Sequence, residues 1–254
     1  MNDTSRNRFA AGLLAAFLVV FAVLAVDPHD RTTWALENIL VGTAIGVLAR
    51  HHRRFPLSRV SYGLVFVFLV LHEIGAHFTY ERVPYEEWSA RVFGTTPGAA
   101  LGWTRNHYDR IVHFAFGLLL AYPVRELHRR IAGAKGFWSY FFVVESTMAA
   151  SMAYELFEWA GVAMLGDAPA GQSFLGAQGD PWDAHKDMAL ATLGAAVAML
   201  LTLAGNLALQ PEFAREWRDS VAIDRAKPLG ETAIAQMWHA RRGRERRNRP
   251  RPRH

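Results

Sequence analysis

Carboxylates and imidazoles occur in this sequence inside long apolar stretches, where charge is unfavourable. Five acidic residues and three histidines lie within such stretches: Glu37, Glu73, Glu145, Glu155 and Glu158, with His72, His77 and His113. An ionisable side chain in a membrane helix usually faces the interior of the helix bundle and has a partner there. The same stretches contain no lysine or arginine. The partners must therefore be other acids and imidazoles, protons or a bound cation.

The spacing of these residues, together with three aspartates at the ends of apolar stretches, forms pairs on single helix faces. The pairs are Glu73 and His77, Asp109 and His113, and Asp183 and Asp187, each four residues apart, and Glu155 and Glu158, three apart. Side chains three or four residues apart are neighbours on the surface of a helix. Four helices would each present one pair, and helical bundles build metal sites from such inward-facing carboxylates and imidazoles.

The chemistry of these donors predicts a divalent metal such as zinc, manganese or iron. The chain has no cysteine, so the donors are oxygen and nitrogen, which suit these ions. The predicted metal ligands are Glu73, His77, Asp109, His113, Asp183 and Asp187.

Glu155 and Glu158 are the predicted catalytic residues, one as an additional ligand and one as a general base. Two acids three residues apart within an apolar run repel each other unless one is protonated or a cation lies between them. Asp183 and Asp187 have a simpler alternative role, because acids at the N-terminus of a helix are favoured by the helix dipole. A single histidine in an apolar helix can likewise be a hydrogen-bonded core residue. These alternatives stay open at the level of sequence.

The elements that position these residues are blocks of apolar sequence about as long as a membrane is thick. The chain has 254 residues, of which 51% are hydrophobic and 20% charged, and all 28 Lys and Arg lie outside the blocks. The blocks are 9–26, 34–49, 60–78, 111–124, 137–165 and 188–209. A helix of about 20 apolar residues spans the hydrocarbon core. This pattern excludes a soluble globular domain and a disordered chain, and predicts an all-α, polytopic membrane helix bundle of about six transmembrane helices over residues 1–210.

The basic residues predict the orientation of this bundle, because short cytoplasmic loops are rich in Lys and Arg. Residues 50–59 hold four arginines and no acid, and residues 125–135 hold four basic residues and one acid. With six alternating spans, both termini are then cytoplasmic. Residues 79–110 form an outer loop, and residues 211–254, which include 12 basic residues, form a basic cytoplasmic tail that we expect to be partly disordered. The first block could instead be a signal sequence cleaved near Ala25.

The depth of the acids and imidazoles follows from this topology. At 1.5 Å per residue, His77 is about 25 Å from the cytoplasmic start of its helix at Val60. Glu155 is about 27 Å from Phe137 by the same rise. Antiparallel helices therefore bring their ionisable residues to one layer near the outer face, and of the acids within the blocks only Glu145 is nearer the cytoplasm.

The basic tail and the apolar blocks also indicate partners. A polybasic segment beside a membrane attracts anionic lipid, so membrane lipid is the expected partner. No nucleic-acid recognition fold accompanies the arginines, and we expect no nucleic acid. A homo-oligomer is left open.

The ordered strings ALENILVG, RRFPLS, HEIGAHFTY, VPY, NHYDRIVHFAFGLLLAYPVRE, ELFEW and GDPWDAHKDM resemble the YjdF-type family of bacterial inner-membrane proteins, from about Trp34 to Leu209. This resemblance implies a multi-pass protein of the inner membrane. Asp109-Arg110-x-x-His113, the acids Glu155 and Glu158, Asp183 with Asp187, and the string ATLGA at 191–195 are more distantly similar to VanZ-like membrane proteins. Both resemblances imply a fold and a location and leave the reaction open.

Three classes of function fit these observations. The first is a membrane enzyme in which a metal-activated water at the outer leaflet hydrolyses a lipid-linked or envelope substrate. The second is a proton- or ion-coupled transporter that uses the same acids as relay sites. The third is a noncatalytic protein that binds a lipid, an ion or another subunit. The residues alone do not choose between an enzyme and the other two classes.

Overall fold

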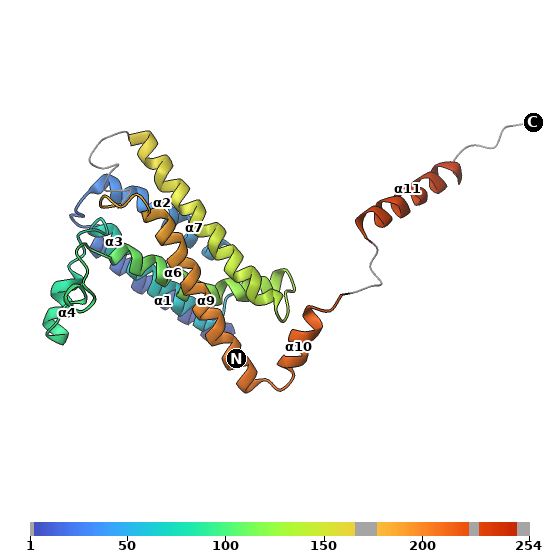
Figure 1. The fold of residues 1–254 in the computed structure, drawn as a ribbon, viewed down its shortest axis with the longest axis horizontal. Coiled ribbons are helices and arrows are strands. Elements are labelled where there is room, and N and C mark those ends of the chain that lie inside the picture. The colour runs from blue at the N-terminus through green and yellow to red at the C-terminus, as the bar shows by residue number, and fades with distance from the viewer. Residues whose placement is uncertain (1–2, 166–176, 224–228, 248–254) are drawn as a thin grey trace, which may run out of the picture.

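The structure, a computed structural model, describes residues 3–165, 177–223 and 229–247, and these residues form helices and no strands (Figure 1). The long helices of the bundle are α1 (Asp3–Leu24), α2 (Arg31–His51), α3 (Arg59–His77), α6 (Tyr108–Ile131), α7 (Trp138–Leu165) and α9 (Asp183–Leu209). The shorter α4 (Tyr85–Phe93) and α5 (Pro97–Leu101) lie between α3 and α6, whereas α10 (Phe213–Ser220) and α11 (Gly230–Arg247) follow the bundle. The predicted all-α membrane bundle is confirmed.

Six long helices correspond to the six apolar blocks, and four of them are long and apolar enough to cross a membrane by length and composition. These four are α1, α2, α3 and α9, with mean hydropathies between 1.3 and 2.0. Helices α6 and α7 are longer than α2 and α3 but include charged residues such as Arg125 and Glu145. Because α6 packs against α3 and α9 and contacts α7, it lies in the same layer as the apolar helices. That α6 and α7 also cross the membrane stays a prediction.

Large apolar side chains cover the outside of this bundle. On α1, Val19 and Val23 are 64% and 65% exposed, and on α9 Leu200 and Leu201 are 63% and 66% exposed. Soluble monomers rarely leave such continuous apolar surface in contact with water. The exposed surface therefore faces lipid. Phe17 of α1 is buried against α2 and α3, so the first helix packs as a member of the bundle.

Helices α6 and α9 approach each other closely at two glycines. A Cβ atom on Gly117 of α6 would overlap the backbone carbonyl oxygen of Ala191, and one on Gly194 of α9 would overlap the carbonyl oxygen of Phe114. Ala191 and Ala195 are fully buried beside them. Small residues at membrane helix interfaces allow such close backbone contact. This contact sets α6 and α9 against each other along their length, and it positions the residues at their outer ends.

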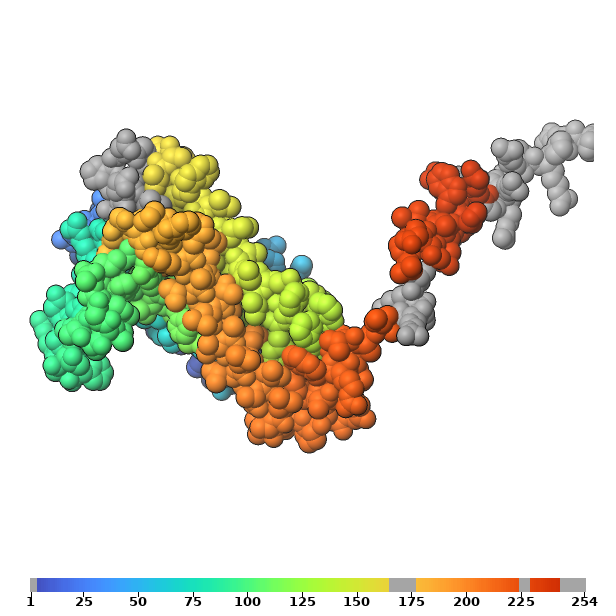
Figure 2. Space-filling view, viewed as in Figure 1, coloured from blue at the N-terminus to red at the C-terminus, as the bar shows by residue number. Residues whose placement is uncertain are grey.

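The chain after α9 begins with a helix that packs on the bundle. Phe213 of α10 is buried among Tyr140 and Met199. Glu216 accepts a hydrogen bond from the backbone N–H of Gly136, at 2.9 Å. Residues 211–254 were predicted as one basic tail, and α10 ties the first part of that segment to the end of the bundle that holds the α6–α7 connection. Helix α11 stands away from the bundle (Figures 1 and 2).

The orientation of the bundle is open to a direct test. Reporter fusions after Lys135 and after Gly94 should report opposite sides of the membrane, because α6 runs between these two points. A fusion after Ser220 should agree with the one after Lys135, since Phe137 and Ser220 are hydrogen-bonded at 2.9 Å. Cytoplasmic signals after Lys135 and Ser220 and an external signal after Gly94 are expected. The same side reported from Gly94 and Lys135 would contradict the predicted topology.

Candidate metal centre

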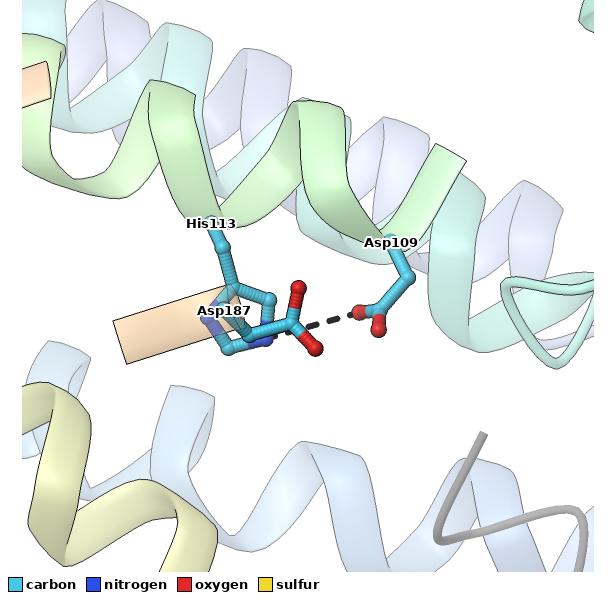
Figure 3. Close-up of side chains that lie close together, drawn as sticks. All are labelled: Asp109, His113 and Asp187. Carbon is cyan, nitrogen blue, oxygen red and sulfur yellow. Dashed lines mark ion pairs between the residues drawn. The ribbon is translucent and has the colours of Figure 1, made fainter. Parts of the chain in front are cut away.

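Three side chains from α6 and α9 meet at one end of the bundle. Asp109 and His113 lie one turn apart at the start of α6, and Asp187 lies one turn into α9 (Figure 3). Each offers a ligand atom, and these atoms all lie within 4.8 Å of one another. His113 Nε2 is 3.5 Å from Asp109 Oδ1. His113 and Asp187 are both buried, so the three groups share a site from which water is largely excluded.

Helix α7 adds two more carboxylates to this group. Glu155 Oε1 lies 3.8 Å from His113 Nε2. Glu158, which is buried, interacts electrostatically with Asp109, Glu155 and Asp187. Three carboxylates from three helices therefore surround one imidazole, and a fourth, Glu158, interacts with all three. Carboxylates grouped in this way require a compensating proton or cation.

The oxygen atoms of these carboxylates are poorly satisfied by the protein. Asp187 Oδ1 and Glu155 Oε1 are buried and have no hydrogen-bond partner. Among the residues that the structure describes, no lysine or arginine forms an ion pair with Asp109, Glu155, Glu158 or Asp187. A buried polar atom without a partner is destabilising and rare in native proteins. A cation bound between α6, α7 and α9 would satisfy these atoms, and oxygen and nitrogen donors fit a divalent ion.

A second set of buried polar groups connects this centre to α2 and α3. The hydroxyl of Tyr154 on α7 donates a hydrogen bond to Glu37 Oε2 at 2.7 Å. Glu37 Oε2 also lies 4.0 Å from His72 Nε2. The other ring nitrogen of His72, Nδ1, is 2.6 Å from the hydroxyl of Tyr80. The network orients Tyr154, which is adjacent to Glu155 in the sequence, and links the candidate metal centre to α2 and α3.

Tyr80 reaches His72 because the chain reverses sharply after α3. Thr79 and Tyr80 both have left-handed backbone angles, with φ of 54° and 53°. The tyrosine ring then packs against Gly75, where a Cβ atom would overlap it. Left-handed angles are uncommon for residues other than glycine and mark functional or strained sites. Because Gly75 has no side chain, there is room for the ring of Tyr80. The turn directs this loop residue toward His72 and into the buried network.

Two arginines and two aspartates form an ion-paired cluster beside the centre, near the starts of α6 and α9. Arg105 Nη2 lies 2.6 Å from Asp183 Oδ1, and Arg110 Nη2 lies 2.6 Å from Asp180 Oδ2. Hydrogen bonds from Lys186 and from the backbone N–H of Trp182 lower the pKa of Asp180 to about 2. Asp180 therefore stays ionised at any physiological pH, and the aspartate–arginine cluster ties the residues before α6 to the start of α9.

The structure brings five of the eight predicted site residues together and gives two of the other three, His77 and Asp183, different partners. Asp109, His113, Glu155, Glu158 and Asp187 form the centre described above.

Two of the other three residues, Asp183 and His77, have a specific partner that explains their position, whereas both carboxylate oxygens of the buried Glu73 have no hydrogen-bond partner. Asp183 is neutralised by Arg105 and Arg110. His77 Nδ1 is 2.8 Å from the carbonyl oxygen of Leu24, which accepts its hydrogen bond and ties α3 to the end of α1. Glu73 is buried and lies beside Asn38 of α2. The contacts of Asp183 and His77 thus explain their positions without a cation, and a role of these three residues as metal ligands stays a prediction.

Four residues of the buried network have no place in the site that spacing predicts: Glu37, His72, Tyr80 and Tyr154. The sequence indicated a functional role for Glu37 and His72, since both are ionisable residues within apolar blocks. Neither, however, has a second ionisable residue three or four positions away on its own helix. The tyrosines carried no such signal, because an uncharged aromatic residue is ordinary both in an apolar block, where Tyr154 lies, and in a loop beside the membrane, where Tyr80 lies. Their roles depend on contacts between helices.

Comparison with known proteins places the chain among membrane proteins. A family model described as "Predicted membrane protein (DUF2238)" matches residues 9–206. The inner membrane protein YjdF of Escherichia coli strain K12 is 32% identical over 187 residues, which cover 72% of this chain and 83% of YjdF. No solved structure matches. The YjdF-type resemblance is confirmed, and the likeness to VanZ-like proteins stays a prediction.

Proposed function

The chain belongs to the DUF2238 family of predicted membrane proteins, and from that premise we propose that it is a metal-dependent hydrolase of the bacterial inner membrane. Its relative YjdF is an inner membrane protein, which supports the same location for this chain. The substrate would be a lipid-linked or envelope molecule, because the centre lies at one end of a membrane bundle. The cation would be divalent, with zinc, manganese and iron as candidates.

The observation that carries this proposal is the set Asp109, His113 and Asp187, whose ligand atoms lie within 4.8 Å of one another in a buried site. Three protein ligands with a position left for water or substrate are typical of catalytic metal sites. The ligands stand on two helices that are fixed by close backbone contact at Gly117 and Gly194. A rigid arrangement of this kind favours binding of an ion in one geometry.

Glu155 and Glu158 supply the remaining chemistry. Glu155, 3.8 Å from His113, is placed to complete the ligand set. A cation held by these residues would supply a more acidic water and would polarise an ester or phosphoryl oxygen. Glu158 would accept one proton of that water as its oxygen attacks the ester centre. The bond to the alcohol would then break and Glu158 would return the proton to the leaving alkoxide, so that one water is consumed for each acid and alcohol formed.

In the part of the chain that the structure describes, the buried carboxylates all lie toward the end of the bundle that holds the centre, which favours this reading over transport. Below the centre, the helices are packed through a largely apolar buried cluster that contains Val143, Ala195 and Met199, and the buried polar side chains of α7 beside it, Ser151 and Thr147, carry only hydroxyl groups. A proton- or ion-coupled transporter would need titratable groups across this layer. Glu145 is exposed on the outside of α7 and is not placed to supply them.

Metal analysis of the protein purified without chelator tests the proposal. The wild type is expected to contain a stoichiometric divalent metal, and His113→Ala is expected to lose it because the only imidazole among the ligands is gone. His77→Ala is the matched control, since His77 also lies at the outer end of a helix but is bonded to the carbonyl of Leu24. It should keep full metal content. A metal-free wild type after supplementation with zinc, manganese or iron would refute the proposed function.

A further inference from the structure

A cavity of about 380 Å³ lies beside the metal centre, between α2, α3, α6 and α7. Asp109, His113, His72 and Tyr154 line it at its polar end. Apart from Ser151, the rest of the lining is mostly apolar and includes Val41, Leu69, Val112, Phe116, Leu120 and Phe157. Its volume is within the range of about 300–1,000 Å³ that small-molecule sites occupy.

The shape of the cavity matches a molecule with one polar end and an apolar body. Asp109 and His113 belong both to the cavity lining and to the metal centre. From Asp109 the lining continues along α6 to Leu120, a distance of about 16 Å at the rise of a helix. A ligand whose polar group reaches the cation would therefore extend its remaining length among apolar side chains, away from the outer face.

The cavity borders an opening between α2 and α7 on the lipid-facing surface. Four of its lining residues, Leu40 and Ala44 of α2 and Ala150 and Ala153 of α7, are also exposed on the outside of the molecule. The hydrogen bond from Tyr154 to Glu37 joins α2 and α7 at the outer end of this opening. Three of the four are alanines, which leave space between the helices. In a bilayer the opening faces hydrocarbon.

We propose that this cavity binds the hydrocarbon chain of a membrane lipid with a phosphate headgroup, and that the chain enters between α2 and α7. The identity of the headgroup rests on the proposed function, since a phosphate oxygen is the hard anionic ligand that a cation held by carboxylates prefers. The chain itself is argued from the apolar lining and the lipid-facing opening. A peptide or a water-soluble ligand would have to leave most of its polar groups unsatisfied along Phe116 and Leu120, because Ser151 supplies a single hydroxyl to an otherwise apolar lining there.

Photocrosslinking in nanodiscs tests this proposal with a defined probe. The protein is placed in phosphatidylcholine nanodiscs that contain a small fraction of phosphatidic acid with a photoreactive acyl chain. Crosslinks to Phe116 and Leu120, which line the cavity, are expected in the wild type. In Ala153→Phe the added ring should block the opening, and labelling of these two residues should fall about tenfold, the change produced by about 1.4 kcal/mol of lost binding. Ala44→Phe blocks the opening from α2 and should act in the same way.

The matched control is Ala149→Phe, on the same helix at a residue that is exposed but does not line the cavity. It should label as the wild type does. If both blocking variants keep full labelling of Phe116 and Leu120, the proposed binding site is refuted even where metal is bound. If the labelling is lost in those variants while the wild type contains no metal, the chain-binding site is supported and the proposed function fails. Equal labelling by a photoreactive diacylglycerol, which has the same acyl chains and no phosphate, would overturn the assignment of the phosphate headgroup.

Discussion

Asp187→Asn is expected to abolish metal binding. The variant should be more stable than the wild type without metal and less stable than the wild type when metal is added. Without metal, the variant should unfold at a higher temperature than the wild type, because one of four mutually repelling carboxylates is gone. With metal at about 100 times the dissociation constant, the wild type gains about 2.7 kcal/mol by linkage, whereas the variant gains little. Thermal midpoints of both proteins, with chelator and with saturating metal, measure the crossover.

Asp183→Asn is the control for this experiment, because Asp183 lies one turn earlier on the same helix and is also buried. Its carboxylate accepts hydrogen bonds from Arg105 and Arg110. Removing the charge leaves two arginines with a weaker partner, so Asp183→Asn should lower the thermal midpoint with or without metal and retain metal binding. Loss of metal from Asp183→Asn but not from Asp187→Asn would show that the cation lies at the other aspartate. No metal-induced shift in the wild type would show that protons alone balance the carboxylates.

The layer in which these acids lie could be predicted from the sequence, because it follows from helix length and charge asymmetry. The rise of a helix placed the Asp109–His113 and Glu155–Glu158 pairs at one depth, and α6 and α7 bring these pairs together. Depth does not give the direction in which each helix is rotated. His72 and Glu73 are adjacent, and they have different partners, since His72 contacts Tyr80 and Glu73 lies beside Asn38. Spacing within one helix could not tell which of them points toward α6.

Two predicted ligands instead form hydrogen bonds with residues that are distant in the sequence, and these contacts are known only from the fold. Asp183 is held by Arg105 and Arg110, which lie more than 70 residues earlier in the chain. His77 is held by the backbone carbonyl of Leu24, which has no sequence signature. The same limitation applies to α10, whose Phe213 fits among Tyr140 and Met199. Within a segment of charged residues, nothing in the sequence singles out that one aromatic residue as buried.

Within the bundle, the close contact between α6 and α9 is expected to be where a small added side chain lowers stability most. Gly194→Ala adds a single methyl group, yet that group would overlap the backbone carbonyl oxygen of Phe114 on α6. A backbone atom cannot move aside as the end of a side chain can, so the helices must separate. Overpacking of this kind costs about 1–3 kcal/mol and occasionally more, and we expect a loss at or above the upper end of that range. The thermal midpoint of the detergent-solubilised protein is the measurement.

Gly205→Ala on the same helix is the matched substitution, because a Cβ atom there meets nothing within 4 Å. Alanine is favoured over glycine in a helix by about 1 kcal/mol, so this variant should be as stable as the wild type or more stable. The two variants also separate packing from metal binding. Asp187 stands two turns before Gly194 on α9, and separation of α6 from α9 would move it away from Asp109 and His113. Gly194→Ala should therefore lose metal although every ligand is present, and full metal content in a destabilised Gly194→Ala protein would show that the site does not depend on this contact.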